Sequence, residues 1–457
     1  MKIPTTLKIS ISGARGIIGD SLTPQLTAVL AQAFTTYIGG GPILVGRDAR
    51  RSGIMLAEAV TAGILAVGGQ PIDAGICAIP TFLYLTKAHK AAGGIAVTAS
   101  HNPKEWNGLK FIGGDGLYLT PHQTEEYLDV YHQGDFAFVP AERFKTEISV
   151  ADGNDLHLRR ILARIDADRI RRRRFRVALD CNNGAGAVLA PRLLAELGCD
   201  VIPLSVEPNG EFVHDPEPLP ENITGICRAV RKSGADIGFV QDADADRLAI
   251  VDDSGVPLGE ELTLALAARY VLGKRKGSIV CNLSTSRVID DIAAASGVRV
   301  FRTKIGEINV VEKLLAARPK AVIGGEGNGG VIYPDVHPCR DSFTAMGLIL
   351  EAMAASGKRI SALARTLPRY FMIKKKIAGS PESAYRLIEI LKKRYEKRGR
   401  VDLRDGLRVE FADYWTHVRP SNTEPVIRVQ AESKSRARAQ TALDALKAEI
   451  EDIQKKI

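Results

Sequence analysis

Short apolar runs alternate with longer amphipathic segments along the first third of the chain. Runs at 42–45, 70–74 and 91–97 predict strands, and the apolar residues of 54–67 recur at the three- and four-residue spacing of a helix. This alternation of strand, loop and helix predicts a mostly parallel sheet covered by helices. Polar loops follow the first and the third of these strands. Because α/β sheets bind ligands beyond the carboxyl ends of their strands, both loops are candidates for a site.

The third of these strands ends at Val97 and runs into a polar loop that carries Ser100. Asn102-Pro103 interrupts regular structure there, because proline fixes its own φ and disfavours a helical conformation in the residue before it. Lys110 follows closely in the sequence, so an anion near Ser100 would meet positive charge. Taken alone, such a loop is typical of an ordinary polar turn.

A charged, weakly patterned stretch at 135–155 predicts a domain boundary, and a second α/β unit follows it. Its pattern predicts a strand at 175–179, a loop at 180–186 and a helix at 187–197. The loop superficially resembles a dinucleotide-binding turn, but Leu189 stands where the third glycine should be. The pattern therefore argues against a nicotinamide cofactor.

Three carboxylates, Asp242, Asp244 and Asp246, occupy alternate positions between two apolar strands. Acids crowded into one turn repel each other unless a cation lies among them, and hard oxygen ligands suit Mg²⁺. An EF-hand is excluded, because Arg247 stands where its glycine is required. A phosphatase of the haloacid dehalogenase type also uses an acidic pair after a strand, and that alternative stays open.

The second half of the chain predicts one more α/β unit and a small α+β domain. The former has strands at 278–283 and 321–323 and a helix from Ser286, and the second strand opens into a glycine-rich loop around Glu326. A ligand could approach a glutamate among glycines closely, but from glycine content alone the pattern favours a tight hairpin. The later pattern predicts a basic helix over 374–400, strands at 407–411, 415–418 and 426–429, and a last amphipathic helix from Arg436. The loop at 419–425 provides arginines, hydroxyls and backbone N–H groups that suit a phosphate.

Composition limits the classes of protein to which the chain can belong. The 457 residues predict about three domains from length alone, and the net charge of +9 suits nucleic acid or a small anionic substrate. Few aromatic residues and no zinc-finger spacing argue against nucleic acid. Six scattered cysteines predict reduced thiols rather than a disulfide framework. With no apolar leader and no apolar run of spanning length, we expect a cytoplasmic protein without a membrane partner.

Four motifs, in order along the chain, resemble those of the alpha-D-phosphohexomutase family. They are T-A-S-H-N-P with N-G-x-K, D-A-D-A-D-R, G-E-G-N-G-G and R-P-S-N-T-E-P. The resemblance covers essentially the whole chain and implies an α/β fold of four domains around a central cleft. Three would be α/β domains with mixed sheets, at 1–150, 151–256 and 257–368, and the fourth a smaller C-terminal α+β domain at 369–457.

The resemblance also implies a role for individual residues. Ser100 would be the phosphorylated serine and would bind Mg²⁺ together with Asp242, Asp244 and Asp246. The reacting phosphoryl group would be faced by basic and polar side chains: Arg15, His101, Lys110 and Arg247. The substrate would contact Thr303, Gly306, Glu326, Asn328, Arg419, Ser421, Asn422, Thr423 and Arg428.

The implied activity is the interconversion of hexose 6-phosphate and hexose 1-phosphate through the phosphoserine and a 1,6-bisphosphate, which would also serve as activator. The partners would be small sugar phosphates, and the protein a monomer or homodimer. Gly330 stands where many relatives have a histidine, so His101, His337 or Lys110 would replace it. The form of the loops resembles archaeal phosphoglucosamine mutases and favours glucosamine phosphate, with a phosphomannomutase or phosphoglucomutase as the alternative.

Three other classes make different predictions. A phosphatase with Asp242 as nucleophile would release phosphate without needing Ser100. A non-catalytic sugar-phosphate binding protein would never carry phosphate on the serine. A nucleic-acid-binding protein would show strongly salt-dependent binding.

Overall fold

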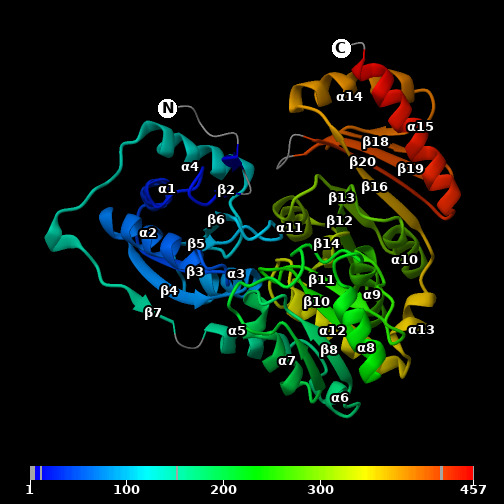
Figure 1. Cartoon of the computed structure of the whole chain (residues 1–457), viewed down its shortest axis with the longest axis horizontal. Helices are drawn as coiled ribbons and strands as arrows, with labels where there is room; N and C mark the ends of the chain where they lie inside the picture. Colours follow the sequence, from blue (N-terminus) through cyan, green and yellow to red (C-terminus); the bar gives the residue numbers. More distant parts are fainter. Residues whose placement is uncertain (1–5, 11–12, 151–152, 422–425, 456–457) are drawn as a thin grey trace. The chain divides into compact units, whose positions relative to one another are not determined.

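The computed structural model describes residues 6–10, 13–150, 153–421 and 426–455 (Figure 1). The chain forms two compact units. Unit 1 comprises Met1–Val271 and Asn328–Ala364, and unit 2 comprises Leu272–Gly327 and Arg365–Ile457. Each unit is therefore assembled from segments that are distant in the sequence.

The first sheet of unit 1 has seven strands in the order β1-β2-β6-β5-β3-β4-β7. Its strands are β1 (Lys8–Ser10), β2 (Gly13–Ile17), β3 (Pro42–Arg47), β4 (Gln70–Ile76), β5 (Gly93–Val97), β6 (Trp106–Gly113) and β7 (Ile148–Ser149). Strands β5, β3, β4 and β7 are parallel, whereas β6 returns antiparallel to β5 and pairs with β2. The sheet is thus mixed, as the family resemblance implied, and not mostly parallel.

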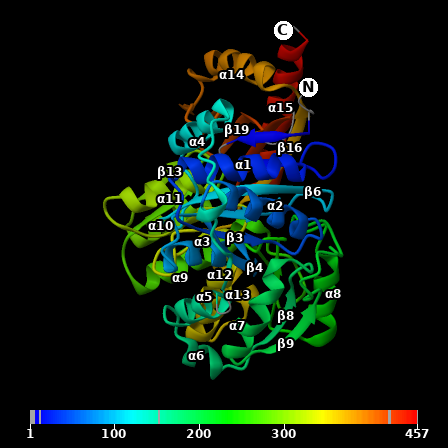
Figure 2. The ribbon, with the colours of Figure 1, turned by 90° about the vertical axis from the view of Figure 1, so that its left-hand side faces the viewer.

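Helices cover both faces of this sheet. They are α1 (Pro24–Tyr37), α2 (Gly53–Ala66), α3 (Ile79–Ala88) and α4 (Pro121–Gln133), followed by the short turn η1 (Ala141–Arg143). Helices α1, α2 and α4 bury one face through a cluster that includes Phe34, Phe111 and Tyr127, and α1 lies along α2 (Figure 2). A separate cluster around Phe82 seats α3 against the strands. Both layers hold β3 and β5 rigidly, so the loops after these strands start from fixed points.

The second sheet of unit 1 has the order β11-β10-β8-β9. Its strands are β8 (Arg176–Asp180), β9 (Asp200–Leu204), β10 (Ile237–Gln241) and β11 (Leu248–Val251). The helices around it are α5 (Gly153–Leu162), α6 (Ala167–Arg171), α7 (Ala190–Glu196) and α8 (Thr224–Ser233). The helix predicted over 187–197 is shorter, because the tight turn η2 (Ala185–Val188) precedes α7 and Pro191 lies in its first turn.

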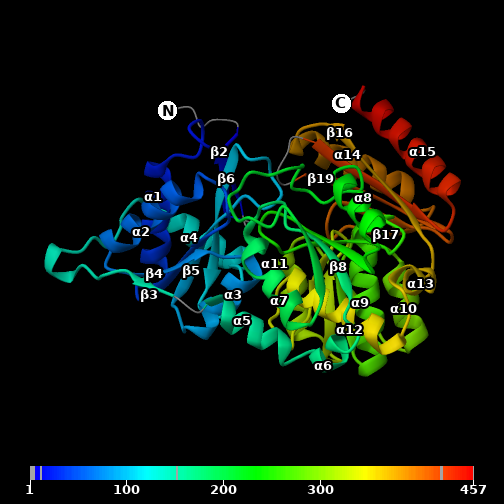
Figure 3. The same cartoon turned by 60° about the horizontal axis from the view of Figure 1, so that its bottom comes forward.

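The second segment of unit 1 begins with β15 (Gly330–Ile332) and continues into α12 (Ser342–Ser356) and α13 (Ile360–Arg365). Asp341 caps α12 by accepting from the backbone N–H groups of Phe343 and Thr344. Helix α12 packs against α5 and α6 (Figure 3). The residues just before α12 are thereby fixed to the body of the unit.

Unit 2 contains parallel strands of one sheet and a separate antiparallel sheet. The parallel strands are β12 (Ser278–Asn282), β13 (Val300–Thr303) and β14 (Ala321–Glu326), with α10 (Val288–Ser296) and α11 (Glu307–Ala316). The antiparallel sheet has the order β16-β20-β19-β18-β17. Its strands are β16 (Phe371–Ala378), β17 (Arg400–Asp402), β18 (Leu407–Glu410), β19 (Tyr414–Pro420) and β20 (Val426–Ser433). Helices α14 (Pro381–Tyr395) and α15 (Arg436–Gln454) pack on this sheet. The sequence boundary between the first segment of unit 1 and unit 2 falls within α9 (Glu260–Lys274).

Two predicted elements of unit 2 are wrong in extent. The helix predicted over 374–400 begins only at Pro381, because residues 371–378 form the edge strand β16. Lys374, Lys375 and Lys376 lie on that edge, where charged side chains discourage further strand pairing. The strand predicted at 321–323 continues through Gly324 and Gly325 to Glu326. Glu326 therefore ends a buried strand instead of standing in a loop.

Among the described residues, no helix is both long enough and apolar enough to cross a lipid bilayer.

Candidate active site

Ser100 lies at the carboxyl end of β5 in a tight, strained turn. Its φ of 52° falls in the left-handed region that residues with a side chain rarely adopt. Its backbone N–H donates to Thr98 Oγ1 at 3.0 Å, and the N–H of Asn102 donates to the carbonyl of Ala99 at 3.1 Å. The turn directs the Ser100 hydroxyl to Asp242, with 3.4 Å between Oγ and Oδ2. The serine and the acidic loop predicted separately from the sequence are thus in contact.

Arg50 stabilises this turn from inside the protein. Its guanidinium donates to the carbonyls of Ser100 at 2.7 Å, Asn102 at 2.6 Å, Pro103 at 2.6 Å and Trp106 at 3.0 Å. It is 1% exposed and also bonds Asp48 at 3.0 Å. Sequence reasoning did not select Arg50, although the polar loop after the strand at 42–45 was the available signal. Arg50 holds the backbone on which Ser100 depends.

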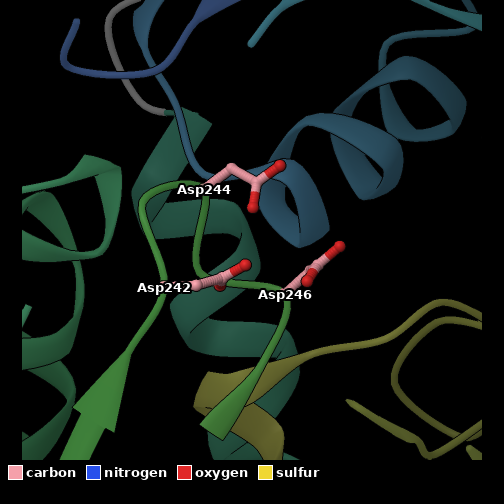
Figure 4. Close-up of side chains that lie close together, drawn as sticks. All are labelled: Asp242, Asp244 and Asp246. Atoms are coloured by element: carbon pink, nitrogen blue, oxygen red, sulfur yellow. The ribbon is translucent and has the colours of Figure 1, made fainter. Parts of the chain in front are cut away.

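The loop between β10 and β11 brings three carboxylates together. The strands pair as a hairpin from Gln241 opposite Leu248, so Asp242, Asp244 and Asp246 project from one short connection. One oxygen of each acid lies within 4.8 Å of the others, and all three residues are buried. Figure 4 shows their side chains directed into the same space beside the loop.

The pKa values of Asp242 and Asp244 shift in opposite directions. Burial raises the pKa of Asp242 well above its usual value, and the charges of Asp246 and Asp244 add to that rise. Burial also disfavours the charged form of Asp244, but attraction and a hydrogen bond from Lys110 outweigh it and lower the pKa of that carboxyl. Three acids in such a place need additional positive charge.

Two carboxylate oxygens show that the loop fits a divalent cation. Within the part of the chain that the structure describes, Asp244 Oδ1 and Asp246 Oδ1 are buried without a hydrogen-bond partner. Burying an anionic oxygen without a hydrogen-bond partner raises the free energy of the folded protein unless a cation approaches that oxygen. Oxygen donors from three carboxylates are the ligands that Mg²⁺ prefers. The donor set therefore fits magnesium.

Basic side chains surround the acids. Lys110 Nζ lies 2.8 Å from Asp244 Oδ2, and Arg247 Nε lies 3.9 Å from Asp242 and 3.7 Å from Asp246. Arg247 also donates to His101 Nδ1 at 3.1 Å, which requires that nitrogen to be unprotonated. In agreement, burial and nearby arginines lower the pKa of His101 well below its usual value. Arg15 contacts the loop that carries Ser100 and His101, donating to Asn102 Oδ1 at 3.2 Å.

The three candidates to replace the histidine that relatives have at the position of Gly330 lie in two different places. Lys110 and His101 lie at the acidic loop, as described above. His337 instead donates from Nε2 to the carbonyl of Gly116 at 2.8 Å and packs edge-on against Tyr84. Burial lowers the pKa of His337 to about 4. The described contacts of His337 therefore anchor a loop and do not bring it to the acids.

In unit 2, Glu326 is held at the end of β14. Its Oε1 accepts from Asn282 Nδ2 at 2.7 Å and from the N–H of Gly306 at 3.0 Å. Gly306 has a φ of 118° and stands at the start of α11, a conformation that suits glycine. Thr303 is buried at the end of β13 and donates to the carbonyl of Lys304. Glu326 and Gly306 are thus in contact, and Glu326 and Thr303 end two strands that lie on either side of β12 in the parallel part of the sheet.

The arginines of the C-terminal loop come from adjacent antiparallel strands. Arg419 in β19 pairs in register with Arg428 in β20, and Arg428 Nε donates to Ser421 Oγ at 3.3 Å. Burial lowers the pKa of Arg419. Asn422 and Thr423 lie outside the described residues.

In unit 1, Asn328 begins the hairpin before β15 and accepts from the N–H of Gly330 at 3.2 Å.

His417 lies beside these arginines and gives unit 2 a pH dependence. Its Nδ1 is 3.1 Å from Ser284 Oγ, and its Nε2 donates to the carbonyl of Asp405 at 2.6 Å. Burial lowers its pKa to about 3, and Arg408 and Arg419 add to that effect, although Asp405 and Asp402 oppose it. Between that value and about 6.5, the unfolded chain binds the proton that the folded chain does not.

Stability must therefore fall as the pH falls below about 6.5. We expect His417→Gln to remove about 2 kcal/mol of the destabilisation that the wild type undergoes between pH 7 and pH 5. The measurement is the denaturant midpoint of both proteins at each pH, with His122→Gln as an exposed control. Equal pH dependence in wild type and His417→Gln would contradict the assignment.

Family models match the chain over nearly its full length. The four successive domains of phosphoglucomutase/phosphomannomutase match at residues 7–138, 155–255, 260–371 and 379–449, the last being the C-terminal domain. A phosphoglucomutase/phosphomannomutase of Thermococcus kodakarensis is 37% identical over 94% of this chain and 96% of its own length. A protein of Methanopyrus kandleri named "Probable phosphoglucosamine mutase" is 35% identical over 95% of each chain.

Solved structures agree with the sequence relatives. The crystal structure of a phosphoglucomutase/phosphomannomutase family protein from Burkholderia thailandensis matches with a TM-score of 0.85 and 26% identity, and covers 98% of both chains. The N-acetylphosphoglucosamine mutase of Aspergillus fumigatus, solved with GlcNAc-6P and magnesium, shares the fold with a TM-score of 0.62 and 16% identity. It covers 99% of this chain and 97% of its own.

A four-domain α/β chain with a serine placed against a buried acidic loop defines a phosphohexomutase, an isomerase of the phosphotransferase type. The chain belongs to the phosphoglucomutase/phosphomannomutase family. This family is magnesium-dependent, and the buried acidic triad of this chain could hold such a cation.

Proposed function

We propose that this chain interconverts glucosamine 6-phosphate and glucosamine 1-phosphate through a phosphorylated Ser100. The contact of Ser100 Oγ with Asp242, inside a group of buried acids and bases, carries the proposal. A serine phosphorylated there would place its phosphoryl group among Arg15, Lys110 and Arg247. Phosphoryl transfer is catalysed mainly by positioning and by stabilisation of charge on the transferring group.

In the first half of the proposed reaction, the phosphoryl group passes from Ser100 to the free hydroxyl of the hexose phosphate. The bond from phosphorus to Oγ breaks as the bond to the sugar oxygen forms, and the proton of the sugar hydroxyl ends on Ser100 Oγ, so that the serine regains its hydroxyl. The 1,6-bisphosphate then turns over and returns its other phosphate to Ser100, which reverses those changes at the second sugar oxygen. Hexose 1,6-bisphosphate also serves as activator, because it can phosphorylate Ser100.

Mg²⁺, held by Asp242, Asp244, Asp246 and the phosphoserine, would neutralise charge on the transferring phosphoryl group. Lys110 keeps Asp244 ionised and so available as a ligand. Arg50 and Thr98 hold the backbone of the turn, so the reacting oxygen starts from one fixed position. These residues provide the positioning that the chemistry requires.

We assign recognition of the sugar and of its other phosphate to unit 2 and to the start of the Asn328 hairpin. Glu326 and Asn328 present a carboxylate and an amide, which suit sugar hydroxyl or amino groups. Arg419, Ser421 and Arg428 suit the non-reacting phosphate, together with Asn422 and Thr423 of the same loop and with Thr303 and Gly306. Several relatives named as phosphoglucosamine mutases support glucosamine, and one named phosphoglucomutase/phosphomannomutase supports the alternative substrates.

The proposal extends to the surroundings of the enzyme. The partners are small sugar phosphates, and a cytoplasmic monomer or homodimer is the expected form. The cysteines of the described residues take part in no disulfide, and we expect them to be reduced thiols.

A substrate panel tests the proposed function. The protein with Mg²⁺ and catalytic hexose 1,6-bisphosphate is offered the 6-phosphates of glucosamine, glucose and mannose in separate assays. We expect the largest kcat/KM for glucosamine 6-phosphate, together with a gain of one phosphate on Ser100 in the intact mass. A larger value for glucose or mannose would overturn the substrate assignment, and release of free phosphate without a serine adduct would overturn the mutase assignment.

A further inference from the structure

Arg340 lies against the acidic loop from a distant part of unit 1. Its Nη2 is 2.5 Å from Asp246 Oδ2, and both side chains are buried, 10% and 0% exposed. The other oxygen of that carboxylate, Oδ1, has no hydrogen-bond partner among the described residues and lies 3.7 Å from Arg247 Nε. Arg340 thus fixes one oxygen of Asp246 and leaves the other available.

The backbone around Arg340 is held from both sides. Arg340 bridges to Ile332 of β15, and the N–H of Asp341 donates to the carbonyl of Val331 at 2.9 Å. Asp341 caps α12 and also pairs with the buried His157 at 3.2 Å. The arginine therefore extends from a fixed backbone, which favours a positioning role over a mobile contact.

Gly330 makes room for the arginine. A Cβ at this position would fall on Arg340 Cδ and lie 3.0 Å from Cγ. Gly330 is absent from the residues with positive φ, so its backbone alone does not require glycine. The missing side chain is needed for space, and the side chain that uses the space is Arg340.

We propose that Gly330 and Arg340 act as a pair that positions Asp246 for the divalent cation of the active site. Arg340 is the positioning residue, and Gly330 is the cleared space that its stem requires. The kinetic consequence rests on the proposed function, whereas the effect on cation binding does not.

Charge and position predict opposite results when the arginine is removed. If Arg340 acted only through its charge, replacing it would tighten cation binding, because one positive charge near the site disappears. If it acts by holding Asp246, replacement weakens binding, since the carboxylate is no longer fixed. Changes in residues that orient metal ligands typically cost about 10- to 100-fold in affinity. We expect that loss in Arg340→Met, and a smaller loss in Arg340→Lys, which keeps a donor without the planar fork.

The test is a double-mutant cycle on the full chain, with Mn²⁺ as the probe and its dissociation constant measured by electron paramagnetic resonance. Gly330→Ala should weaken Mn²⁺ binding in the wild-type background, because the new Cβ displaces the arginine. In the Arg340→Met background it should change the constant by less than about twofold, since the side chain that the new Cβ displaces no longer holds Asp246. Arg359→Met is the matched control, because that arginine is 82% exposed.

Unchanged or tighter Mn²⁺ binding in Arg340→Met would overturn the inference. Additive effects of Gly330→Ala and Arg340→Met on the Mn²⁺ binding free energy would also overturn it. As the kinetic arm, raising Mg²⁺ should restore kcat in Arg340→Met while KM for the hexose phosphate stays near the wild-type value. If the two substitutions are coupled as expected in Mn²⁺ binding but the wild type interconverts no hexose phosphate, the proposed function is refuted and this inference stands. If the wild type has full mutase activity but the two substitutions are not coupled, this inference is refuted and the proposed function stands.

Discussion

Ser100→Ala is expected to lower kcat by on the order of a thousandfold or more, because the group that carries the phosphate is gone. The hydroxyl makes one described side-chain contact, a 3.4 Å bond to Asp242, so its loss leaves little of the fold unsupported. The left-handed φ of 52° is strained by the Cβ atom, which alanine and serine share, so the substitution adds no backbone strain. The thermal midpoint should therefore change little, while turnover disappears.

The measurement combines steady-state turnover, intact mass and the thermal midpoint in one set of proteins. Ser356→Ala is a matched control, because Ser356 lies at the end of α12 and its hydroxyl donates to the carbonyls of Ala352 and Met353. We expect the control to keep its activity and its phosphate. Undiminished release of free phosphate by Ser100→Ala would move the chemistry to Asp242 and favour a phosphatase.

The sequence predicted what depends on short, local patterns. Strand ends could be located because apolar runs stop abruptly before polar loops, as at Val97 and at Gln241. Three acids at alternate positions suggested a cation because their repulsion is a local property, and the structure brings Asp242, Asp244 and Asp246 together. The division into four domains followed from the resemblance, and the family models match all four.

Residues that act from a distance could not be found in this way. Arg50 contacts a loop that begins 50 positions later, and Arg340 contacts Asp246 from 94 positions away. Arg50 stands in the polar loop after the strand at 42–45, but nothing in that loop indicates which residues the arginine contacts, and nothing near Arg340 distinguishes it from the other basic residues of the chain. Their partners are determined by the packing of sheets and helices, which no periodicity records.

The misjudged elements have a similar cause. The segment at 374–400 is rich in basic residues at both ends, but 377–385 carries no Lys or Arg, and Ser380-Pro381 marks the start of a helix. Its charge gave no sign that residues 371–378 pair with β20 along the edge of a sheet. A partner strand supplied by β20, far along the chain, outweighs the local preference for helix. The extension of β14 through Gly324 and Gly325 likewise depends on pairing with β12.

Arg50→Met is expected to loosen the turn that carries Ser100 and to abolish most of the turnover. Methionine fills part of the volume but takes this donor from four carbonyls. It also leaves the buried Asp48 without its ion-pair partner, although Thr98 Oγ1 and the backbone N–H of residue 50 still donate to that carboxylate. Removing one partner of a buried ion pair costs about 3–5 kcal/mol. Because Arg50 bonds the loop at several points, we expect that cost in the local opening free energy of the segment from β5 to β6.

Hydrogen exchange of the amides between Gly93 and Gly113 measures this directly, and the expected loss corresponds to roughly a hundredfold or more in exchange rate. Arg51→Met is the matched control, because Arg51 is adjacent in sequence but 81% exposed and paired with Glu211 on the surface. Exchange that accelerates equally in both variants would show that the arginine stabilises the domain generally. Exchange that accelerates only in Arg50→Met, together with lost turnover, would show that the strained conformation of Ser100 depends on this one buried guanidinium.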